Sequence, residues 1–194
     1  MIHKTIRQYY LLLILFRAGI SMITAMYVTF LLSKGLNLLE VNLVNFVFFT
    51  TLFLCEIPTG AFADVFGRKT SFVMSCIVFS VSMFFYGFSE SFWQFTIAES
   101  LAAVAATLAS GAFEAWLVDN LRHHGHEESL HPVFATASQI KHGTSIVAAF
   151  IGAVLADISL ALPWLVGGVL FLVAGIIAFL VMKEEYFVRA PPLI

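Results

Sequence analysis

The stretch Gly60–Lys69 reads Gly-Ala-Phe-Ala-Asp-Val-Phe-Gly-Arg-Lys and decides how the rest of the chain is interpreted. It lies between two long apolar runs and brings one acid, one glycine and two bases together over residues 64–69. A helix that ends near Asp64, breaks at Gly67 and restarts after Lys69 makes a tight, charged corner. Such charges gather where helices leave the hydrocarbon of a membrane. The stretch therefore predicts a turn at a membrane surface between two spanning helices.

The composition supports a location in the bilayer. Of the 194 residues, 60% are hydrophobic and 11% are charged, whereas a soluble domain carries about 25% charged residues. So few charges cannot cover the surface of a soluble protein of this length. Cys55 and Cys76 lie inside apolar runs, which indicates buried packing rather than a disulfide or a metal site. We expect the lipid bilayer to surround the chain, and we expect no nucleic-acid partner.

Six apolar runs are long enough to cross the hydrocarbon, which takes about 20 residues of helix. They cover roughly residues 10–32, 41–63, 70–88, 92–118, 135–157 and 160–182, and a cytoplasmic tail of residues 183–194 follows them. Because backbone polar groups in lipid must be paired internally, runs of this length must be helices. The sequence therefore predicts an all-α integral membrane protein, with residues 1–194 forming a single bundle of six transmembrane helices.

Lysine and arginine residues set the expected orientation of these spans. With an even number of spans, both termini lie on one side, and that side carries Lys4, Arg7, Arg68, Lys69, Arg122, Lys183 and Arg189. The other side carries Lys34, while Lys141 could snorkel from the fifth run toward the basic side. We therefore expect a multi-pass protein of the cell (inner) membrane, with both termini and the Gly60–Lys69 corner in the cytoplasm.

The corner resembles the loop between the second and third helices of the major facilitator superfamily, whose usual pattern is Gly-x-x-x-Asp-Arg-x-Gly-Arg-Arg/Lys. Gly60, Asp64, Gly67, Arg68 and Lys69 fall on this pattern. Val65 departs from it, because the family usually has a basic residue there. The resemblance implies the N-terminal half of a facilitator fold, built from two inverted three-helix repeats.

This resemblance also implies a function, namely secondary active transport of a small organic solute by rocker-switch alternating access. The Glu56–Thr59 run before the corner looks like that of drug-efflux members, which implies export. Since a facilitator has two six-helix halves, the partner would be a missing C-terminal half or a second copy of this chain. No cofactor is implied, and no nucleotide-binding loop, nucleophile elbow or HExxH helix supports an enzyme. The alternative is a non-transporting truncated or scaffold protein that binds another subunit.

Three charged residues are expected in the cytoplasmic half of the membrane. Arg17 and Glu56 each lie about 10 Å from the cytoplasmic ends of their helices, and Glu114 lies slightly closer to the surface. A lone charge at that depth costs several kcal/mol, so these side chains should face an interior and pair. We expect Arg17 to pair with Glu56, Glu114 or both. The pair would hold helices together, act in gating or substrate binding, or couple transport to protons.

Two further polar residues are candidates for a membrane cavity. Asn45 shares a helix face with Glu56, eleven residues further on. This stripe suits either a water-filled cavity or hydrogen bonds to a neighbouring helix. Glu99 has no basic partner at its depth. It would be protonated, pair with a group of a missing partner, or bind a cation, which makes it a candidate proton site.

The run Ser110–Asp119 looks like the corresponding segment of efflux-type facilitators. By this resemblance Asp119 would pair with Arg68, and Asp64 would face a helix of the C-terminal half, as a latch that breaks when the cytoplasmic side opens. The alternative is a solvated charge cluster worth under about 1 kcal/mol. The loop His123–Glu128 matches no standard zinc spacing, so we expect a solvated loop and no metal.

Overall fold

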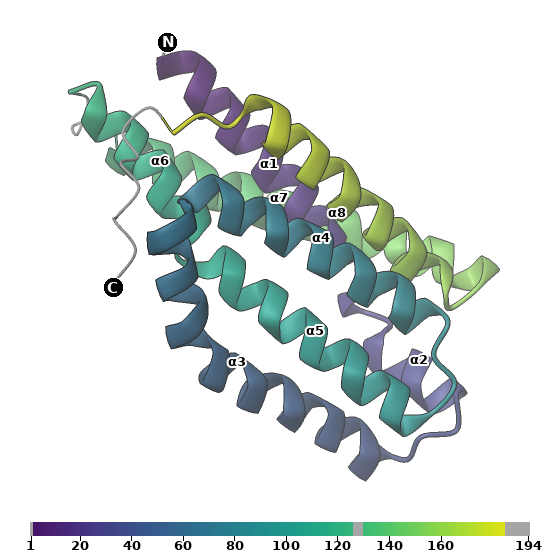
Figure 1. Cartoon of the computed structure of the whole chain (residues 1–194). Coiled ribbons are helices and arrows are strands. Elements are labelled where there is room, and N and C mark those ends of the chain that lie inside the picture. The colour runs from purple at the N-terminus through teal and green to yellow at the C-terminus, as the bar shows by residue number, and fades with distance from the viewer. Residues whose placement is uncertain (1, 126–129, 185–194) are drawn as a thin grey trace.

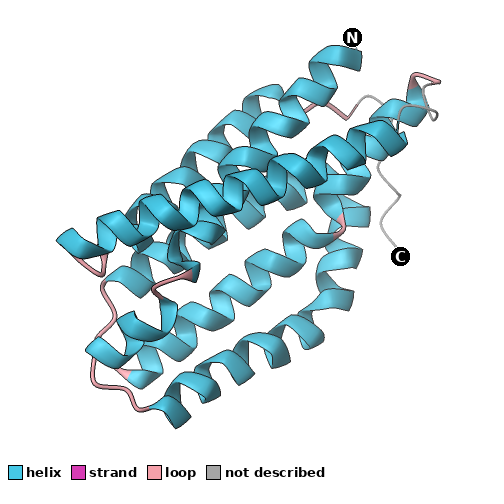
Figure 2. Cartoon of the chain, turned by 180° about the vertical axis from the view of Figure 1, so that it is seen from behind, coloured by secondary structure: helices cyan, strands magenta, loops and turns pink. Residues whose placement is uncertain are grey.

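Helices make up nearly all of the described part of the chain. The computed structural model describes residues 2–125 and 130–184, and these ranges contain no β-strand (Figure 2). The described helices are α1 (Ile2–Thr24), α2 (Tyr27–Ser33), α3 (Leu38–Phe66), α4 (Arg68–Gly87), α5 (Phe92–Ser110), α6 (Ala112–His123), α7 (Leu130–Ile158) and α8 (Leu162–Val181). Glu127, Glu128, Arg189 and most of the expected tail lie outside the described residues.

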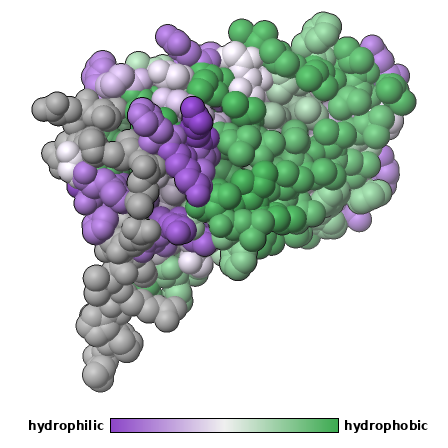
Figure 3. Space-filling model, turned by 90° about the horizontal axis from the view of Figure 1, so that it is seen from above, coloured by the Kyte–Doolittle hydropathy of each residue, from purple (hydrophilic) through white to green (hydrophobic). Residues whose placement is uncertain are grey.

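Six spans within the described residues are long and apolar enough to cross a membrane. The first is α1, which the short α2 continues after a turn at residues 25–26. The fourth joins α5 and α6 over Phe92–His123, and α3, α4, α7 and α8 are the other four. Figure 3 shows the resulting surface, a broad apolar region with polar residues gathered at its two ends. The all-α, six-helix membrane fold predicted from the sequence is confirmed.

Two spans contain breaks that hydropathy alone does not reveal. The first span breaks at residues 25–26, and the fourth breaks at Gly111 between α5 and α6. Apolar residues continue through the first break, and the second interrupts its apolar run only at Ser110 and Gly111, so the length of the runs does not reveal either break. By contrast, α3 begins where local chemistry predicts a start. The Asn37 side chain accepts a hydrogen bond from the Glu40 backbone N–H at 3.0 Å, and Glu40 accepts one from the Asn37 N–H at 2.8 Å.

The six spans lie in a curved row of neighbours. Contacts link α3 to α5, α5 to α4, α4 to α8, α8 to α1 and α1 to α7 (Figure 1). By span number, the row reads 2, 4, 3, 6, 1, 5. If spans 1, 2 and 3 are exchanged with spans 4, 5 and 6, the same row is obtained in reverse, so every pair of neighbours is kept. That symmetry is the one expected of two three-helix repeats in a facilitator half. The ends of the row, α3 and α7, are the least buried spans.

Hydroxyl groups and small residues hold the middle of the row together. On α4, the Ser75 hydroxyl donates to the Ala105 carbonyl of α5 at 2.7 Å, and the Ser80 hydroxyl donates to the Gly168 carbonyl of α8 at 2.9 Å. Hydrogen bonds of this kind satisfy polar groups that lipid cannot solvate. Because α4 and α8 form this packed centre, α1, α5 and α7 can line an open space on one side of it.

Candidate functional site

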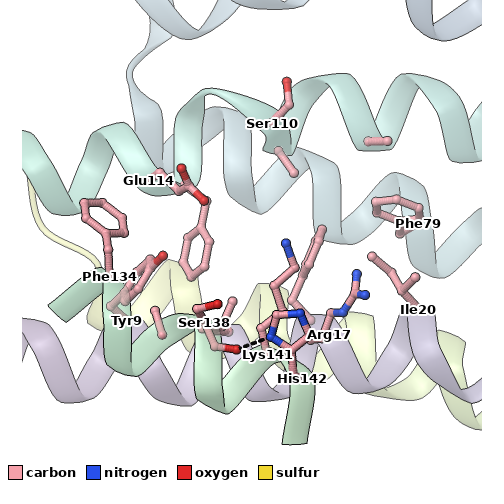
Figure 4. Close-up of a pocket in the computed structure, with 16 residues that line it drawn as sticks. Tyr9, Arg17, Ile20, Phe79, Ser110, Glu114, Phe134, Ser138, Lys141 and His142 are labelled. Atoms are coloured by element: carbon pink, nitrogen blue, oxygen red, sulfur yellow. Dashed lines mark hydrogen bonds between the residues drawn. The ribbon is translucent and has the colours of Figure 1, made fainter. Parts of the chain in front are cut away.

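A cavity of about 490 Å³ opens between α1, α7 and the junction of α5 with α6 (Figure 4). Its polar lining residues are Arg17, Ser110, Glu114, Ser138, Lys141 and His142. Aromatic rings supply much of the remaining wall: Tyr9, Phe16, Phe79, Phe113 and Phe134. A few polar groups set in apolar walls are typical of small-molecule sites.

Arg17 is held in this cavity by the facing helix. Its Nε donates a hydrogen bond to the Ser145 hydroxyl oxygen of α7 at 2.8 Å. The Ser145 hydroxyl in turn donates to the Lys141 carbonyl at 2.8 Å, and the Ser21 hydroxyl lies 3.1 Å from the Ser145 oxygen. The guanidinium therefore leaves α1 toward α7 in one fixed direction, with its two terminal nitrogens free of hydrogen bonds to described residues.

The structure does not contain the ion pair expected between Arg17 and Glu56 or Glu114. The reason is the order of the helices, because α1 neighbours α7 and α8 whereas Glu56 is exposed on α3 at the far end of the row. Glu114 does line the same cavity as Arg17, yet the two side chains form no ion pair. Arg17 is thus stabilised by hydroxyl groups rather than by a carboxylate.

A second cavity of about 490 Å³ lies further from the chain termini. It shares Ile20, Phe79 and Ala106 with the first cavity, so the two form one continuous lining. Asn45 of α3 and Glu99 of α5 both face it, while Glu56 lines neither cavity. Of the expected polar stripe on α3, only the Asn45 end therefore reaches these cavities.

Glu99 is the most buried acidic side chain among those expected at the site, with 8% of its surface exposed. Its cavity also contains Tyr27 and Tyr86, whose hydroxyl oxygens lie 3.3 Å apart. No lysine or arginine is among the residues that line this cavity. Among the described residues that line this cavity, the neighbours of Glu99 are therefore tyrosines and other uncharged side chains rather than bases.

The charged corner at the other end of the molecule breaks at Gly67 as expected, although the next helix begins at Arg68 rather than after Lys69. α3 ends at Phe66, α4 begins at Arg68, and Gly67 between them has a φ of 94°, a conformation that favours glycine. An Arg68 terminal nitrogen lies 3.0 Å from an Asp64 carboxylate oxygen. This pair replaces the expected pair with Asp119, which is half-buried on α6 and forms no ion pair with Arg68.

Glu184, just after α8, completes this corner. One of its carboxylate oxygens accepts a hydrogen bond from the Lys69 backbone N–H at 2.9 Å. A methyl group on Gly67 would lie 2.5 Å from the other oxygen, so a larger residue there would displace the Glu184 carboxylate from this contact. α6 fixes the preceding residue, since the Trp116 indole N–H donates to the Lys183 carbonyl at 2.9 Å. The corner therefore joins three spans rather than two.

Gly60 and the histidines at the end of α6 make no contact with described residues that points to a role in the site. Gly60 is exposed on α3, with open space where a side chain would project. Within residues 2–125 and 130–184, no group of three or more His, Cys, Asp or Glu side chains is arranged to hold a metal ion. His123 and His124 pack edge to face, and the His124 ring lies 2.8 Å from the Asn120 carbonyl.

Comparison with known proteins places this architecture in a family. The family model described as Major Facilitator Superfamily matches residues 9–193. The chain belongs to the Major Facilitator Superfamily. The curated relatives of this facilitator chain include the uncharacterized MFS-type transporter YxaM of Bacillus subtilis, 27% identical over 99 residues, which cover 51% of this chain and 25% of YxaM.

A second facilitator relative is the uncharacterized MFS-type transporter MJ1560 of Methanocaldococcus jannaschii. It is 23% identical over 173 residues, which cover 87% of this chain and 43% of MJ1560. The chain thus spans less than half the length of either curated relative. What it resembles is one half of such a facilitator, as the order of its helices also indicates.

Sequence reasoning missed three residues of this facilitator half. Ser145 and Glu184 have no distinguishing local pattern, and their partners lie 128 and 115 residues away in the chain. For Lys141, which could snorkel toward the basic side, the sequence predicted no place in a cavity, yet it lines the cavity around Arg17. A signal was present for Lys141, since it stands one helical turn before Ser145 and so shares its face of α7.

Proposed function

We propose that this chain forms half of a secondary transporter that moves a small organic solute across the cell membrane by alternating access. The observation that carries the proposal is the continuous lining that runs from Glu114 through Ala106 to Glu99 along one side of the bundle. Polar side chains at membrane depth are costly unless they serve a pathway or a partner. Membership of the facilitator family supports transport as the reason for these residues.

The proposed orientation has both termini and the Gly60–Lys69 corner in the cytoplasm, as the distribution of lysine and arginine favours. In that orientation, the cavity around Arg17 lies in the cytoplasmic half and the cavity around Glu99 lies in the outer half. Export is the proposed direction, because the run before the corner resembles that of efflux members. The corner would then act as a cytoplasmic latch, in which Asp64 contacts the facing half.

The proposed partner is a second six-helix unit, either a C-terminal half or another copy of this chain. Alone, the chain leaves Arg17 and Glu114 on an open face, and a partner bundle would shield them from lipid. Native mass measurement of the full-length protein in mild detergent tests this assembly. Twelve spans per particle are expected, and a stable particle with only six spans would contradict the proposal.

Alternating access can be tested without knowledge of the solute. Ala106 lines both cavities, so an Ala106→Cys variant of the full-length protein, with Cys55 and Cys76 replaced by alanine, places one thiol midway along the pathway. A charged, membrane-impermeant thiol reagent is added to vesicles of each orientation. A transporter exposes the thiol to both sides in turn.

The control for this experiment is an Ile176→Cys variant in the same background. Ile176 is exposed on α8, away from both cavities, and a thiol there should stay unreactive in lipid. Labelling of the Ala106 thiol from one side only would favour the alternative function, a non-transporting scaffold that binds another subunit. Labelling from neither side would mean that Ala106 does not line a water-accessible cavity.

A further inference from the structure

The cavity around Arg17 carries an excess of positive charge that no described residue neutralises. Arg17 and Lys141 are the two strongly basic residues of the lining, and Glu114 is its acidic residue. With His142 counted as neutral, two positive charges and one negative charge leave a net charge of about +1. The Lys141 side chain forms no hydrogen bond or ion pair with any described residue. Neither Lys141 nor Arg17 forms an ion pair with Glu114.

The guanidinium of Arg17 is prepared for an acceptor. Its Nε is already bound to the Ser145 hydroxyl, which fixes the plane and direction of the group. The two terminal nitrogens have no partner among described residues and face the cavity (Figure 4). Two parallel N–H groups at a fixed spacing match the two oxygens of a carboxylate.

Lys141 and Arg17 share the wall on which this acceptor would sit. Figure 4 shows both side chains rising from α7 and α1 into the same space, with Ser110 and Glu114 on the opposite wall. The Ser145 hydroxyl donates a hydrogen bond to the Lys141 carbonyl and accepts one from the Arg17 guanidinium. Ser145 therefore links the backbone of Lys141 to the side chain of Arg17. A single anionic group between them would meet both charges at once.

The apolar walls of the cavity indicate what the uncharged part of the ligand should be. Phe16, Phe79 and Phe113 face the same space and give it an aromatic lining. A volume of about 490 Å³ is within the range of sites that bind drug-sized molecules. Flat apolar groups stack well on such rings.

We propose that this cavity binds an organic monoanion, with a carboxylate held between Arg17 and Lys141 and an apolar body along the phenylalanine rings. This inference rests on the proposed transport function and adds the class of substrate to it. Cationic solutes would meet two like charges and only the carboxylate of Glu114, so they are disfavoured.

The test uses three probes with the same apolar body and different charge: naphthylacetate, the neutral naphthylacetamide and the cationic naphthylethylammonium. Binding to the purified full-length protein in a neutral detergent is measured by titration calorimetry, with empty micelles as the blank. Naphthylacetate is expected to bind at least about tenfold more tightly than the other two, because hydrogen bonds to charged groups are the stronger ones. Equal binding of all three, or tighter binding of the cation, would overturn the proposal.

Substitutions then locate the effect in the cavity. Arg17→Gln and Lys141→Gln should each weaken naphthylacetate binding by about tenfold and leave naphthylacetamide unchanged. Glu114→Gln should strengthen naphthylacetate binding, since it removes the negative charge of the lining. Arg7→Gln is the matched control, because it removes an exposed cation from the same helix outside the cavity. Anion preference that survives in the Arg17→Gln, Lys141→Gln double variant would assign the binding to another place.

Two features keep this result separate from the wider transport proposal. Lys141 makes no side-chain bond in the described chain, so Lys141→Gln should fold even if Arg17→Gln does not. If the Ala106→Cys thiol reacts from both sides while the anion shows no preference, transport stands and the substrate class is wrong. If the thiol reacts from one side and the anion still binds, the cavity is an anion site in a protein that does not transport.

Discussion

The Glu184 carboxylate accepts a hydrogen bond from the Lys69 backbone N–H at 2.9 Å and so caps the first turn of α4. The first N–H groups of a helix have no partner within the helix, and an acidic side chain there also opposes the positive end of the helix dipole. The capping residue follows α8, so the end of the last span is tied to the corner between the second and third spans.

Gly67 is predicted to be intolerant of substitution for this reason. Gly67→Ala would force a side chain into a positive-φ conformation and against the Glu184 carboxylate. A loss of about 1–3 kcal/mol is expected from the backbone conformation alone, and the thermal unfolding midpoint in detergent should fall. Gly60→Ala is the matched control, because open space surrounds that position. The interpretation fails if both alanine variants unfold at the same temperature as the wild type.

Asp64 is predicted to act in conformational cycling rather than in folding. The Asp64 side chain is 67% exposed in its pair with Arg68, so Asp64→Ala should change stability by less than about 1 kcal/mol. In the complete transporter, however, the substitution should stop two-sided labelling of the Ala106 thiol while insertion into the membrane stays normal. Asp157→Ala, a change of an exposed acid at the end of α7, serves as the control. Unchanged labelling in Asp64→Ala would remove the latch role.

Glu99 is predicted to couple transport to protons. It is 8% exposed, faces the apolar cavity beside Tyr27 and Tyr86, and has no lysine or arginine beside it in the lining. In proteoliposomes, Glu99→Gln should abolish the response of naphthylacetate flux to an imposed pH gradient, while exchange without a gradient continues. Glu90→Gln replaces an exposed carboxylate that pairs with Lys34, and it should leave the response intact. A wild-type response in Glu99→Gln would rule out this residue as the proton carrier.

The close approach of α1 and α7 predicts a second sensitive glycine. A methyl group on Gly152 would overlap the Met22 carbonyl, which belongs to the backbone and cannot rotate away. Gly152→Ala should therefore lower the free energy of unfolding by about 1–3 kcal/mol or more. Gly143→Ala on the same helix meets open space and should be neutral or slightly stabilising. Equal stability of the two variants would mean that the helices are not this close.

The number and order of the spans could be predicted because their signals are local. A run of apolar residues and the capping pair Asn37 and Glu40 each lie within a short stretch of chain. The same holds for the corner, where Gly67 and its flanking charges specify a turn at the membrane surface. Glu99 could also be singled out, since an acid within an apolar run is visible in the sequence alone.

The partners of the charged residues could not be predicted, because they depend on which helices are neighbours. Arg17 was expected to meet an acid, but the row of helices brings the hydroxyl of Ser145 to it across 128 residues. Asp64 lies four residues before Arg68, across the break at Gly67, and this nearer acid takes the place of Asp119 as the partner. Hydropathy does not predict the partner of Arg17 or of Arg68, because it reports the depth of a residue in the membrane and not which helices are neighbours.

The cavity lined by Arg17 and Lys141 is the proposed path of an organic anion. The most direct measurement is the labelling rate of the Ala106→Cys thiol from each side of the membrane, with and without naphthylacetate. We predict labelling from both sides and protection by naphthylacetate on both, with no protection by naphthylethylammonium. A thiol that reacts from one side only, or at the same rate whether or not the anion is present, would contradict the account.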